Sequence, residues 1–547
     1  MNPPAPLPRP LALALLLVFS YVFINTAWVS EDAFITFRSV NQLLAGNGPV
    51  WNLGERVQVY THPLWYGLLS LGTGLGLPSY WLSLLLSYLC LLGVLILLGR
   101  QARAEGARPA LLAALALLLT LSRAFVDYSS SGLENPLLHL LLLVHIALYR
   151  SASPLAQKYR WAVFVYGLLF LTRPDGIILT APLMLHLWLQ MLQARQPWLK
   201  STLLALLPVI GWELFSLIYY GSPVPNTALA KLNVDYTAAA RHQQALDYWL
   251  VSWDFDPLTV ATLALALGLG LGWGYRDRWA GLLALGLLLQ LFYINRVGGD
   301  YMVGRFLSAP LLLAVVLLLH LGRTWPGWRW RPHHPRLALL GLGLWLFDQT
   351  ANYGWEPRYL NHYRRHGIND QRGYNFMEQG LLAVLLNNQG RYYFWDGRLP
   401  GRQALTCFIG MNGWRLPLDR PVIDPLALAE PFLARLPSAT GRISGHYERA
   451  LPPGYLASRR DGNNQLVAPA LARLYDDVQL ATRSPALFSR ERWAAIWRLN
   501  SGHYRQLDRH FDRNRTGFHG PDIALAGLAP DFTPGPSLCT PEPLPLF

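Results

Sequence analysis

Apolar runs recur through the sequence up to Phe347, several of them short for a full span, and they limit the folds open to the chain. The first run, Leu11–Val29, has about 19 residues, which is enough to cross ~30 Å of hydrocarbon as a helix. Together the runs predict about eleven spanning helices. The others are Tyr80–Leu98, Pro109–Leu121, Pro136–Tyr149, Trp161–Leu171, Ile177–Leu192, Leu203–Tyr219, Pro257–Trp273, Trp279–Tyr293, Phe306–Leu321 and Leu337–Phe347.

The composition agrees with a multispanning α-helical membrane protein. Of the 547 residues, 52% are hydrophobic and only 14% are charged, whereas a soluble enzyme is ordinarily more polar. The formal net charge is +14, but Lys and Arg concentrate in short loops between the apolar runs, where they act as orientation signals. We therefore expect the lipid bilayer, and no nucleic acid, as the partner of these charges.

The basic residues also give the helices a direction. The run Leu64–Leu77 is interpreted as a short helix along the outer surface, because Arg100, Arg103 and Arg108 then stay in the cytoplasm. The remaining basic loops agree with this orientation. The loops predicted to face outward are Ser30–Pro63, Ser122–Asn135, Arg173–Gly176, Gly221–Phe255 and Asn295–Arg305.

After Phe347 the sequence becomes polar and contains no further run of spanning length. We predict a membrane domain over 1–347, including the outer loop 30–63, and a mixed α/β domain over 348–547. An odd number of spans places the second domain outside the membrane, and about 200 residues are enough to bury a core. Its sequence pattern predicts strands over Tyr392–Trp395 and Ala404–Ile409 and a helix over Ala427–Arg435.

Two neighbouring carboxylates, Glu31 and Asp32, come directly after the first apolar run. They are therefore expected at the boundary between membrane and water, on the side opposite the N-terminus. A carboxylate there can take the proton of a sugar hydroxyl, and Tyr60 and His62 in the same loop can contact a sugar. The alternative is that acids after a first span are only solvated loop residues.

Other outward loops add further charged and amide groups. Glu134 is either an active-site acid or a first-turn acid that the helix dipole favours. Arg173 and Asp175 lie in a tight turn, where their alternative role is only to pair with each other. The remaining substrate-binding candidates, from two later loops, are Asn226, Lys231, Asp300 and Arg305.

Arg38, Lys231 and Arg305 are the cations predicted to hold a lipid phosphate at headgroup depth. Their alternative role is to reach the headgroups of the surrounding lipid. The sequence has no nucleotide-binding glycine loop, no paired His or Cys metal motif and no lipase-type serine elbow. A transfer reaction therefore requires an already activated donor delivered within the membrane, and a role for Mg²⁺ or Mn²⁺ at the carboxylates stays open.

Several ordered motifs resemble the GT-C type glycosyltransferases that use polyprenyl-phosphate sugars. The closer resemblance is to the terminal β-(1→2) arabinofuranosyltransferase family of actinobacteria and its proteobacterial relatives. It extends over nearly the whole chain. The motifs are Glu31–Arg38, Val57–Trp65, Ser131–Glu134, Arg173–Gly176, Gly298–Met302, Val422–Leu428, Pro431–Pro437 and Gly445–Arg449.

This resemblance implies a GT-C-like enzyme of the bacterial inner membrane whose C-terminal domain lies in the periplasm. The implied donor is decaprenyl- or undecaprenyl-phosphate arabinofuranose, and the acceptor is an envelope glycan or glycoprotein. Asp32 is the expected general base and Glu31 its assistant. Glu31 departs from the aspartate expected there, so either acid can be the essential one. The resemblance does not fix the sugar or the stereochemical outcome.

Two other functional classes compete with this interpretation. A transporter or flippase of lipid-linked sugar is expected to carry intramembrane charges and related halves, whereas the acids here gather at the outer boundary. An envelope scaffold would leave the acidic pair replaceable. Cys407 and Cys539 lie in the predicted outer domain, where an oxidising compartment permits a disulfide, although two cysteines do not establish one.

Overall fold

A computed structural model of the protein describes residues 9–107, 109–232, 237–324, 364–365, 367–387, 404–438, 445–449 and 451–504. The chain forms two compact units. The first comprises Met1–Ala33, His62–Val209 and Ala238–Arg391, and the second comprises Phe34–Thr61, Ile210–Thr237 and Tyr392–Phe547. The chain passes between the units inside two helices, α2 (Glu31–Leu44) and α11 (Leu207–Tyr220).

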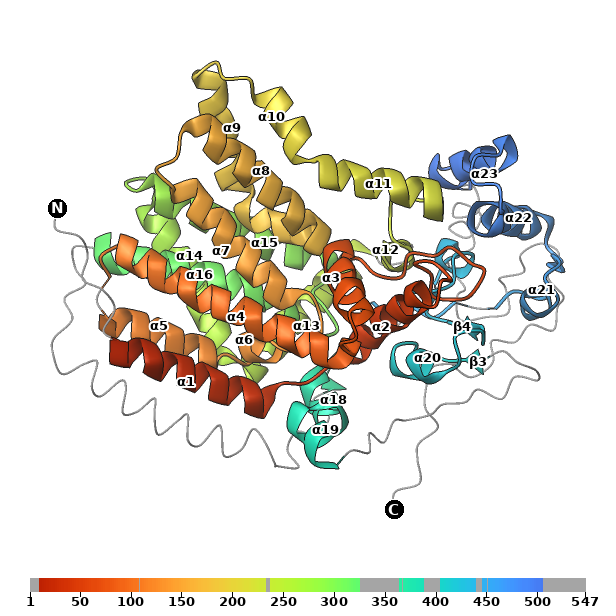
Figure 1. Ribbon diagram of the computed structural model, residues 1–547, viewed down its shortest axis with the longest axis horizontal. Coiled ribbons are helices and arrows are strands. Elements are labelled where there is room, and N and C mark those ends of the chain that lie inside the picture. The colour runs from red at the N-terminus through yellow and green to blue at the C-terminus, as the bar shows by residue number, and fades with distance from the viewer. Residues whose placement is uncertain are drawn as a thin grey trace. The chain divides into compact units, whose positions relative to one another are not determined.

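The described part of the first unit is almost entirely helical (Figure 1). Its helices are α1 (Arg9–Thr26), α3 (Pro63–Gly74), α4 (Ser79–Ala104), α5 (Pro109–Leu121), α6 (Arg123–Asp127), α7 (Asn135–Arg150), α8 (Leu155–Thr172), η1 (Pro174–Thr180), α9 (Ala181–Gln193), α10 (Trp198–Ala205), α13 (Ala238–Phe255), α14 (Pro257–Gly274), α15 (Arg278–Val297), η2 (Arg305–Leu307), α16 (Ser308–Thr324), α18 (Gln371–Gln379) and α19 (Leu381–Asn387).

Five of the described helical segments are long and apolar enough to cross a membrane, or six if the bent pair α10 and α11 counts as one span. They are Ser79–Ala104, Pro174–Gln193, Pro257–Gly274, Arg278–Val297 and Arg305–Gly322. Three shorter apolar helices, Pro10–Thr26, Leu111–Leu121 and Asn135–Arg150, coincide with other predicted spans. A multispanning membrane protein is therefore supported, whereas the predicted number of eleven is not established. The last predicted span, Leu337–Phe347, lies outside the described residues.

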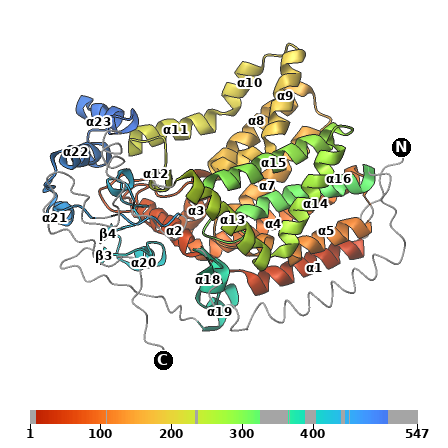
Figure 2. The same cartoon turned by 180° about the vertical axis from the view of Figure 1, so that it is seen from behind.

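Helix α16 is central in the first unit. Within the span Arg305–Gly322, 83% of the residues are buried, against 28% for α14. It packs against α14 and α15 and also contacts α5 and α7, and Figures 1 and 2 show it running among them from both sides. Leu311 to Leu319 are buried without interruption. The start of α16 is therefore a firm support for side chains at that end of the unit.

A segment from the predicted C-terminal domain belongs to the first unit. Strand β1 (Arg364–Arg365) pairs antiparallel with β2 (Ile368–Asn369). Asn369 then accepts a hydrogen bond from the Val303 amide at 3.1 Å and donates one to the Tyr301 carbonyl at 2.7 Å. The connection between α18 and α19 is bonded to the turn before α2, since the Leu381 amide donates to the Ala27 carbonyl at 2.8 Å. The compact units thus divide the chain differently from the predicted boundary at residue 347.

The described part of the second unit combines helices with one two-stranded sheet. Strand β3 (Ala404–Leu405) pairs parallel with β4 (Val422–Ile423). The helices lying wholly in this unit are α12 (Asn226–Leu232), α20 (Met411–Arg415), η4 (Leu433–Arg435), α21 (Tyr455–Asp461), α22 (Pro469–Arg483) and α23 (Arg490–Asn500). The predicted strand Tyr392–Trp395 lies outside the described residues, and only the first two residues of Ala404–Ile409 form a strand.

The predicted helix over Ala427–Arg435 is wrong. Only its last three residues are helical, as the short 3-10 turn η4, and Ala427 has a left-handed backbone with φ of 63°. Pro431 contributes to the difference, because it has no amide hydrogen to donate to Ala427 in a helix. The buried Asp424 also holds a non-helical turn, since its carboxylate accepts hydrogen bonds from the amides of Leu426 at 2.9 Å and Ala429 at 3.0 Å. Such local side-chain bonds compete with helix formation.

Candidate active site

Asp32 lies in the first turn of α2, where the helix dipole favours a carboxylate. Two contacts hold this turn in place. The Ser30 amide donates to the Ser131 carbonyl at 2.8 Å, and the Ser30 hydroxyl accepts from the Ala33 amide at 3.3 Å. The first contact brings the Ser131–Glu134 loop beside the start of α2, so two motifs that are far apart in the sequence are neighbours in space.

A double-glycine turn leads to the second group of site residues. Helix α15 ends at Val297 and is capped by Gly298, which has φ of 83°, and Gly299 follows with φ of 74°. Both values lie in the left-handed region that glycine adopts without strain. A side chain at Gly299 has no room either, because a Cβ atom there would lie 2.5 Å from the ring of Tyr248. The turn therefore directs the chain so that Asp300 and Tyr301 enter the site.

Replacing Gly299 by alanine is expected to destabilise the protein more than replacing Gly106, which has φ of 61° and no heavy atom within 4 Å of an added Cβ. Both changes place alanine in a left-handed conformation, at a cost of about 1–2 kcal/mol. Only Gly299→Ala adds the collision with Tyr248, for about 1–3 kcal/mol more. Thermal unfolding of both variants at one scan rate in detergent tests this difference. Equal midpoints would show that Tyr248 moves aside freely.

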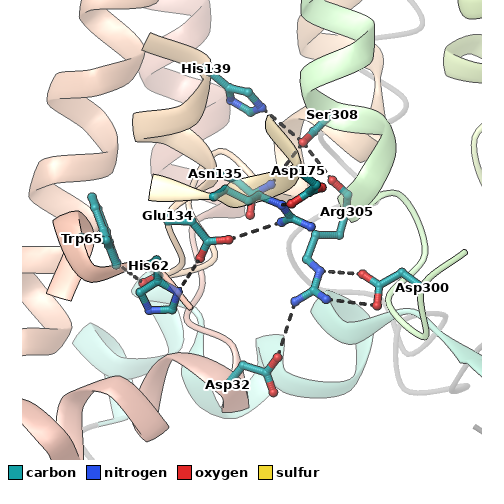
Figure 3. A network of polar contacts seen from close by, with 12 residues as sticks. Asp32, His62, Trp65, Glu134, Asn135, His139, Asp175, Asp300, Arg305 and Ser308 are labelled. Atoms are coloured by element: carbon teal, nitrogen blue, oxygen red, sulfur yellow. Dashed lines mark hydrogen bonds and ion pairs between the residues drawn. The ribbon is translucent and has the colours of Figure 1, made fainter. Parts of the chain in front are cut away.

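Arg305 joins two carboxylates (Figure 3). It donates from Nε to Oδ2 of Asp300 at 2.6 Å and from Nη2 to Oδ1 at 3.0 Å, which is bidentate pairing, and its Nη1 lies 3.5 Å from Oδ2 of Asp32. The Tyr301 hydroxyl donates to both carboxylate oxygens of Asp32, at 3.0 Å each. Burial, together with the charge of Asp32, raises the pKa of Tyr301 well above its usual value, so the phenol stays protonated and donates to Asp32.

A second chain of contacts runs through Glu134. His62 Nδ1 lies 3.2 Å from Oε2 of Glu134, and Arg173 donates from Nη1 to Oε1 at 3.3 Å and from Nε to Asp175 Oδ1 at 2.9 Å. Burial favours the neutral acid, but His62 and Arg173 outweigh it, so the pKa of Glu134 lies below its usual value. Burial lowers the pKa of His62 despite the opposing effect of Glu134. At 3.2 Å, His62 Nδ1 is within hydrogen-bond distance of the Glu134 carboxylate.

The start of α7 is tied to the start of α16 beside these groups. Ser308 Oγ lies 3.2 Å from Nε2 of His139, accepts from the Asn135 amide group at 3.4 Å and donates to the Arg305 carbonyl at 3.1 Å. Figure 3 shows these contacts connecting the Glu134 and Arg305 sides of the network. The predicted site residues Asp32, His62, Glu134, Arg173, Asp175, Asp300 and Arg305 thus gather in the first unit.

Four other predicted residues, Arg38, Tyr60, Asn226 and Lys231, lie in the second unit. The Tyr60 hydroxyl is 2.9 Å from that of Tyr220, and the Asn226 amide group donates at 2.9 Å to the carbonyls of Ala427 and of Leu428. Lys231 is exposed near the end of α12, and Glu31 begins α2 and is partly exposed. That these residues contact the substrate remains a prediction.

The surroundings of Arg38 indicate a structural role. Its side chain is fully buried, and burial lowers its pKa to about 10. The guanidinium stacks on Trp51, 5.2 Å from the ring centre. It donates to the backbone carbonyls of Trp51, Gly413, Leu416, Pro417 and Arg420. These bonds occupy its donors, which leaves none of them for a donor phosphate.

No group of three or more His, Cys, Asp or Glu side chains that could hold a metal ion occurs in the described part of the chain. The carboxylates of the site are instead occupied by arginine, tyrosine and histidine. The described residues therefore present no ligand set for the Mg²⁺ or Mn²⁺ whose role the sequence leaves open.

Two curated proteins match most of the chain. One from Mycobacterium tuberculosis is 29% identical over 536 residues, covering 81% of this chain and 84% of the relative. One from Corynebacterium glutamicum is 28% identical over 559 residues, covering 82% and 79%. The chain is similar over most of its length to terminal β-(1→2)-arabinofuranosyltransferases. This confirms the resemblance predicted from the motifs, although no family model and no solved structure matches.

The network around Asp32 and Glu134 also contains residues that the sequence analysis did not propose as site residues. Tyr301 follows Asp300 in the Gly298–Met302 motif, so its proximity in sequence was an available signal. Ser308 and His139 carried no such signal, because a serine at the start of an apolar helix and a histidine within one are ordinary. Their contact depends on the packing of α7 against α16, which the local sequence does not indicate.

Proposed function

We propose that the protein is a membrane glycosyltransferase that moves arabinofuranose from a polyprenyl-phosphate donor to an envelope glycan or glycoprotein. The network around Asp32 carries this proposal, because it combines a carboxylate at the start of α2 with two arginines, Arg173 and Arg305, in one buried site. The names of the two relatives support the same reaction.

Asp32 is the proposed general base. It takes the proton of an acceptor hydroxyl while the hydroxyl oxygen forms a bond to the anomeric carbon of the sugar. Its side chain is 22% exposed, against 6% for Asp300, so Asp32 is the more accessible of the two carboxylates beside Arg305. Tyr301 fixes the orientation of the Asp32 carboxylate through the paired 3.0 Å contacts. Glu31, one residue earlier, assists Asp32 or orients the acceptor hydroxyl.

Arg305 is proposed to stabilise the leaving group. When the bond between the anomeric carbon and the donor oxygen breaks, its electron pair goes to that oxygen and leaves polyprenyl phosphate with added negative charge. A preorganised guanidinium at this point lowers the barrier. Asp300 holds Arg305 by two hydrogen bonds, while Arg173 supplies a second cation beside Glu134. A net-retaining outcome would need more than one such displacement.

The reaction is proposed to occur on the periplasmic side of the bacterial inner membrane. The basic loops support this orientation through the positive-inside rule. Cys407 is disulfide-bonded, which supports an oxidising compartment for the second unit. Lys231 and the aromatic residues of the second unit are then candidates for contact with the donor phosphate and the acceptor glycan.

Purified protein in detergent, given radiolabelled polyprenyl-phosphate arabinofuranose and an envelope-glycan extract, is expected to transfer label into the glycan. Free arabinose in place of the donor is the control, since it carries no activating phosphate. Label from another lipid-linked sugar but not from this donor would keep the reaction class and contradict the arabinose assignment. Translocation of the lipid without transfer, measured in sealed vesicles, would favour the transporter.

A further inference from the structure

Helix α23 of the second unit exposes large aromatic side chains that the proposed reaction does not use. Trp497 lies within the helix and Phe488 lies two residues before it, and each is 74% exposed. Trp493 is half-buried one turn before Trp497, on the same side of the helix. Tryptophan is on average a highly buried residue in folded proteins, so a group of such rings at the surface indicates contact with a partner.

Another face of α23 fixes the helix to the end of α11. Arg492, Ile496 and Asn500 are spaced by four residues and therefore share this face. Arg492 donates from Nη2 to the Tyr219 carbonyl at 3.1 Å, and the Asn500 amide group donates to the Gly221 carbonyl at 2.9 Å. A Cβ atom at Gly221 would lie only 3.2 Å from the Ile496 side chain. Helix α23 thus lies across the C-terminal end of α11 (Figures 1 and 2).

That end of α11 has the features of a membrane boundary. Helix α11 is the second part of the bent pair that counts as a candidate span, and its apolar side chains Ile210, Leu214 and Phe215 are exposed. The helix closes with Tyr219 and Tyr220, and the Phe215 ring stacks on Tyr219 with 5.1 Å between the ring centres. Aromatic side chains gather at the level of the lipid headgroups. Because α23 lies across this end, we expect it at the same level.

Positive charges accompany the aromatic rings. Arg490 is exposed at the start of α23, on the same face as the exposed tryptophan. Arg56 and Arg492 both donate to the Tyr219 carbonyl, at 3.0 Å and 3.1 Å. This neutral oxygen satisfies their donors but does not cancel their charge. Against these three cations stands the neighbouring exposed acid Glu491. The balance of charge therefore suits a surface of phosphate groups.

We propose that the aromatic face of α23, defined as Phe488, Trp493 and Trp497, lies in the surface of the lipid bilayer beside the end of α11. A helix with aromatic rings on one face and arginines next to them binds such a surface by lying in its plane. The rings enter the headgroup region, and the arginines pair with lipid phosphate. This inference requires α11 to cross the membrane, but it does not depend on the proposed transfer reaction.

A nitroxide label at Ala494→Cys tests this contact, because Ala494 lies between the two tryptophans and leaves all three rings in place. The label is carried by the full chain in a Cys90→Ala background, since Cys90 is free and Cys407 is disulfide-bonded. The chain is reconstituted into vesicles of phosphatidylethanolamine and phosphatidylglycerol. The measurement is the collision rate with oxygen, which concentrates in hydrocarbon, divided by that with a water-soluble nickel chelate present on both sides. Asn463→Cys, exposed in the same unit, is the control position.

The ratio at Ala494 is expected to exceed that at Asn463 by roughly threefold or more, as for a helix buried to headgroup depth. Equal ratios at the two positions would overturn the proposal. Protection of Ala494 from both reagents would also overturn it, because a glycan or a second protein copy would then cover this face.

The double variant Phe488→Ser with Trp497→Ser tests whether the rings themselves make the contact. It is expected to lower the ratio at Ala494 to the value at Asn463, with an unchanged unfolding midpoint in detergent, because both side chains are mostly exposed. Val467→Ser is the matched control, since it removes a 59% exposed apolar side chain elsewhere in the unit, and it is expected to leave the ratio unchanged. A ratio that stays high in the double variant would contradict the proposed role of the rings.

Discussion

Transfer by the Asp32→Asn variant is expected to fall by about 10²- to 10⁴-fold, which is the usual contribution of a general base. The asparagine side chain has nearly the same shape, and its remaining oxygen can still accept the hydrogen bond from Tyr301. It cannot take a proton from an acceptor hydroxyl. The measurement is the initial rate of label transfer at equal amounts of folded protein and donor.

Glu31→Gln is the matched control for this variant, because it removes the neighbouring carboxylate from the same helical turn. A modest loss with Glu31→Gln and a large loss with Asp32→Asn would assign the base to Asp32. The reverse result would assign it to Glu31. If both variants kept transfer within a few-fold of wild type, neither carboxylate would be the base.

Replacing Arg305 by glutamine is expected to lower both stability and transfer. The Asp300 side chain is only 6% exposed and would lose its bidentate partner. Removing one member of a buried ion pair typically costs about 3–5 kcal/mol. The unfolding midpoint of purified protein in detergent measures the first effect, and the transfer rate measures the second.

The double variant Arg305→Gln with Asp300→Asn separates these two effects. It removes both charges, so most of the lost stability is expected to return. Transfer is expected to stay low, because the proposed leaving-group cation is still missing. Recovery of transfer together with stability would show that Arg305 serves only to neutralise Asp300.

The sequence predicted the main features of the first unit because they depend on local patterns. Apolar runs fixed the positions of α4, α14 and α15 to within a few residues at most of their ends. Motifs at the ends of these runs contained most of the residues that gather around Asp32 and Glu134. Helix ends on one side of a bundle meet at one surface, so loop residues predicted to face the same side became neighbours.

Long-range pairing could not be predicted in the same way. Arg38 and Arg305 looked equivalent as cations, but the first donates to backbone carbonyls and the second pairs with Asp300. The difference depends on which chain segment packs beside each side chain. The helix predicted over Ala427–Arg435 failed for a local reason instead, since Pro431 within it has no amide hydrogen to donate to the Ala427 carbonyl.

The contacts of Asn369 and Leu381 determine when during synthesis the site can be completed. Tyr301 is fixed by Asn369, and the turn before Asp32 is fixed by Leu381, but the ribosome makes both supports after the last helix that inserts. Until then, the inserted helices hold the reacting groups without these supports. An unfinished chain in the membrane is therefore expected to lack an ordered site, which forms only after translation has passed residue 381.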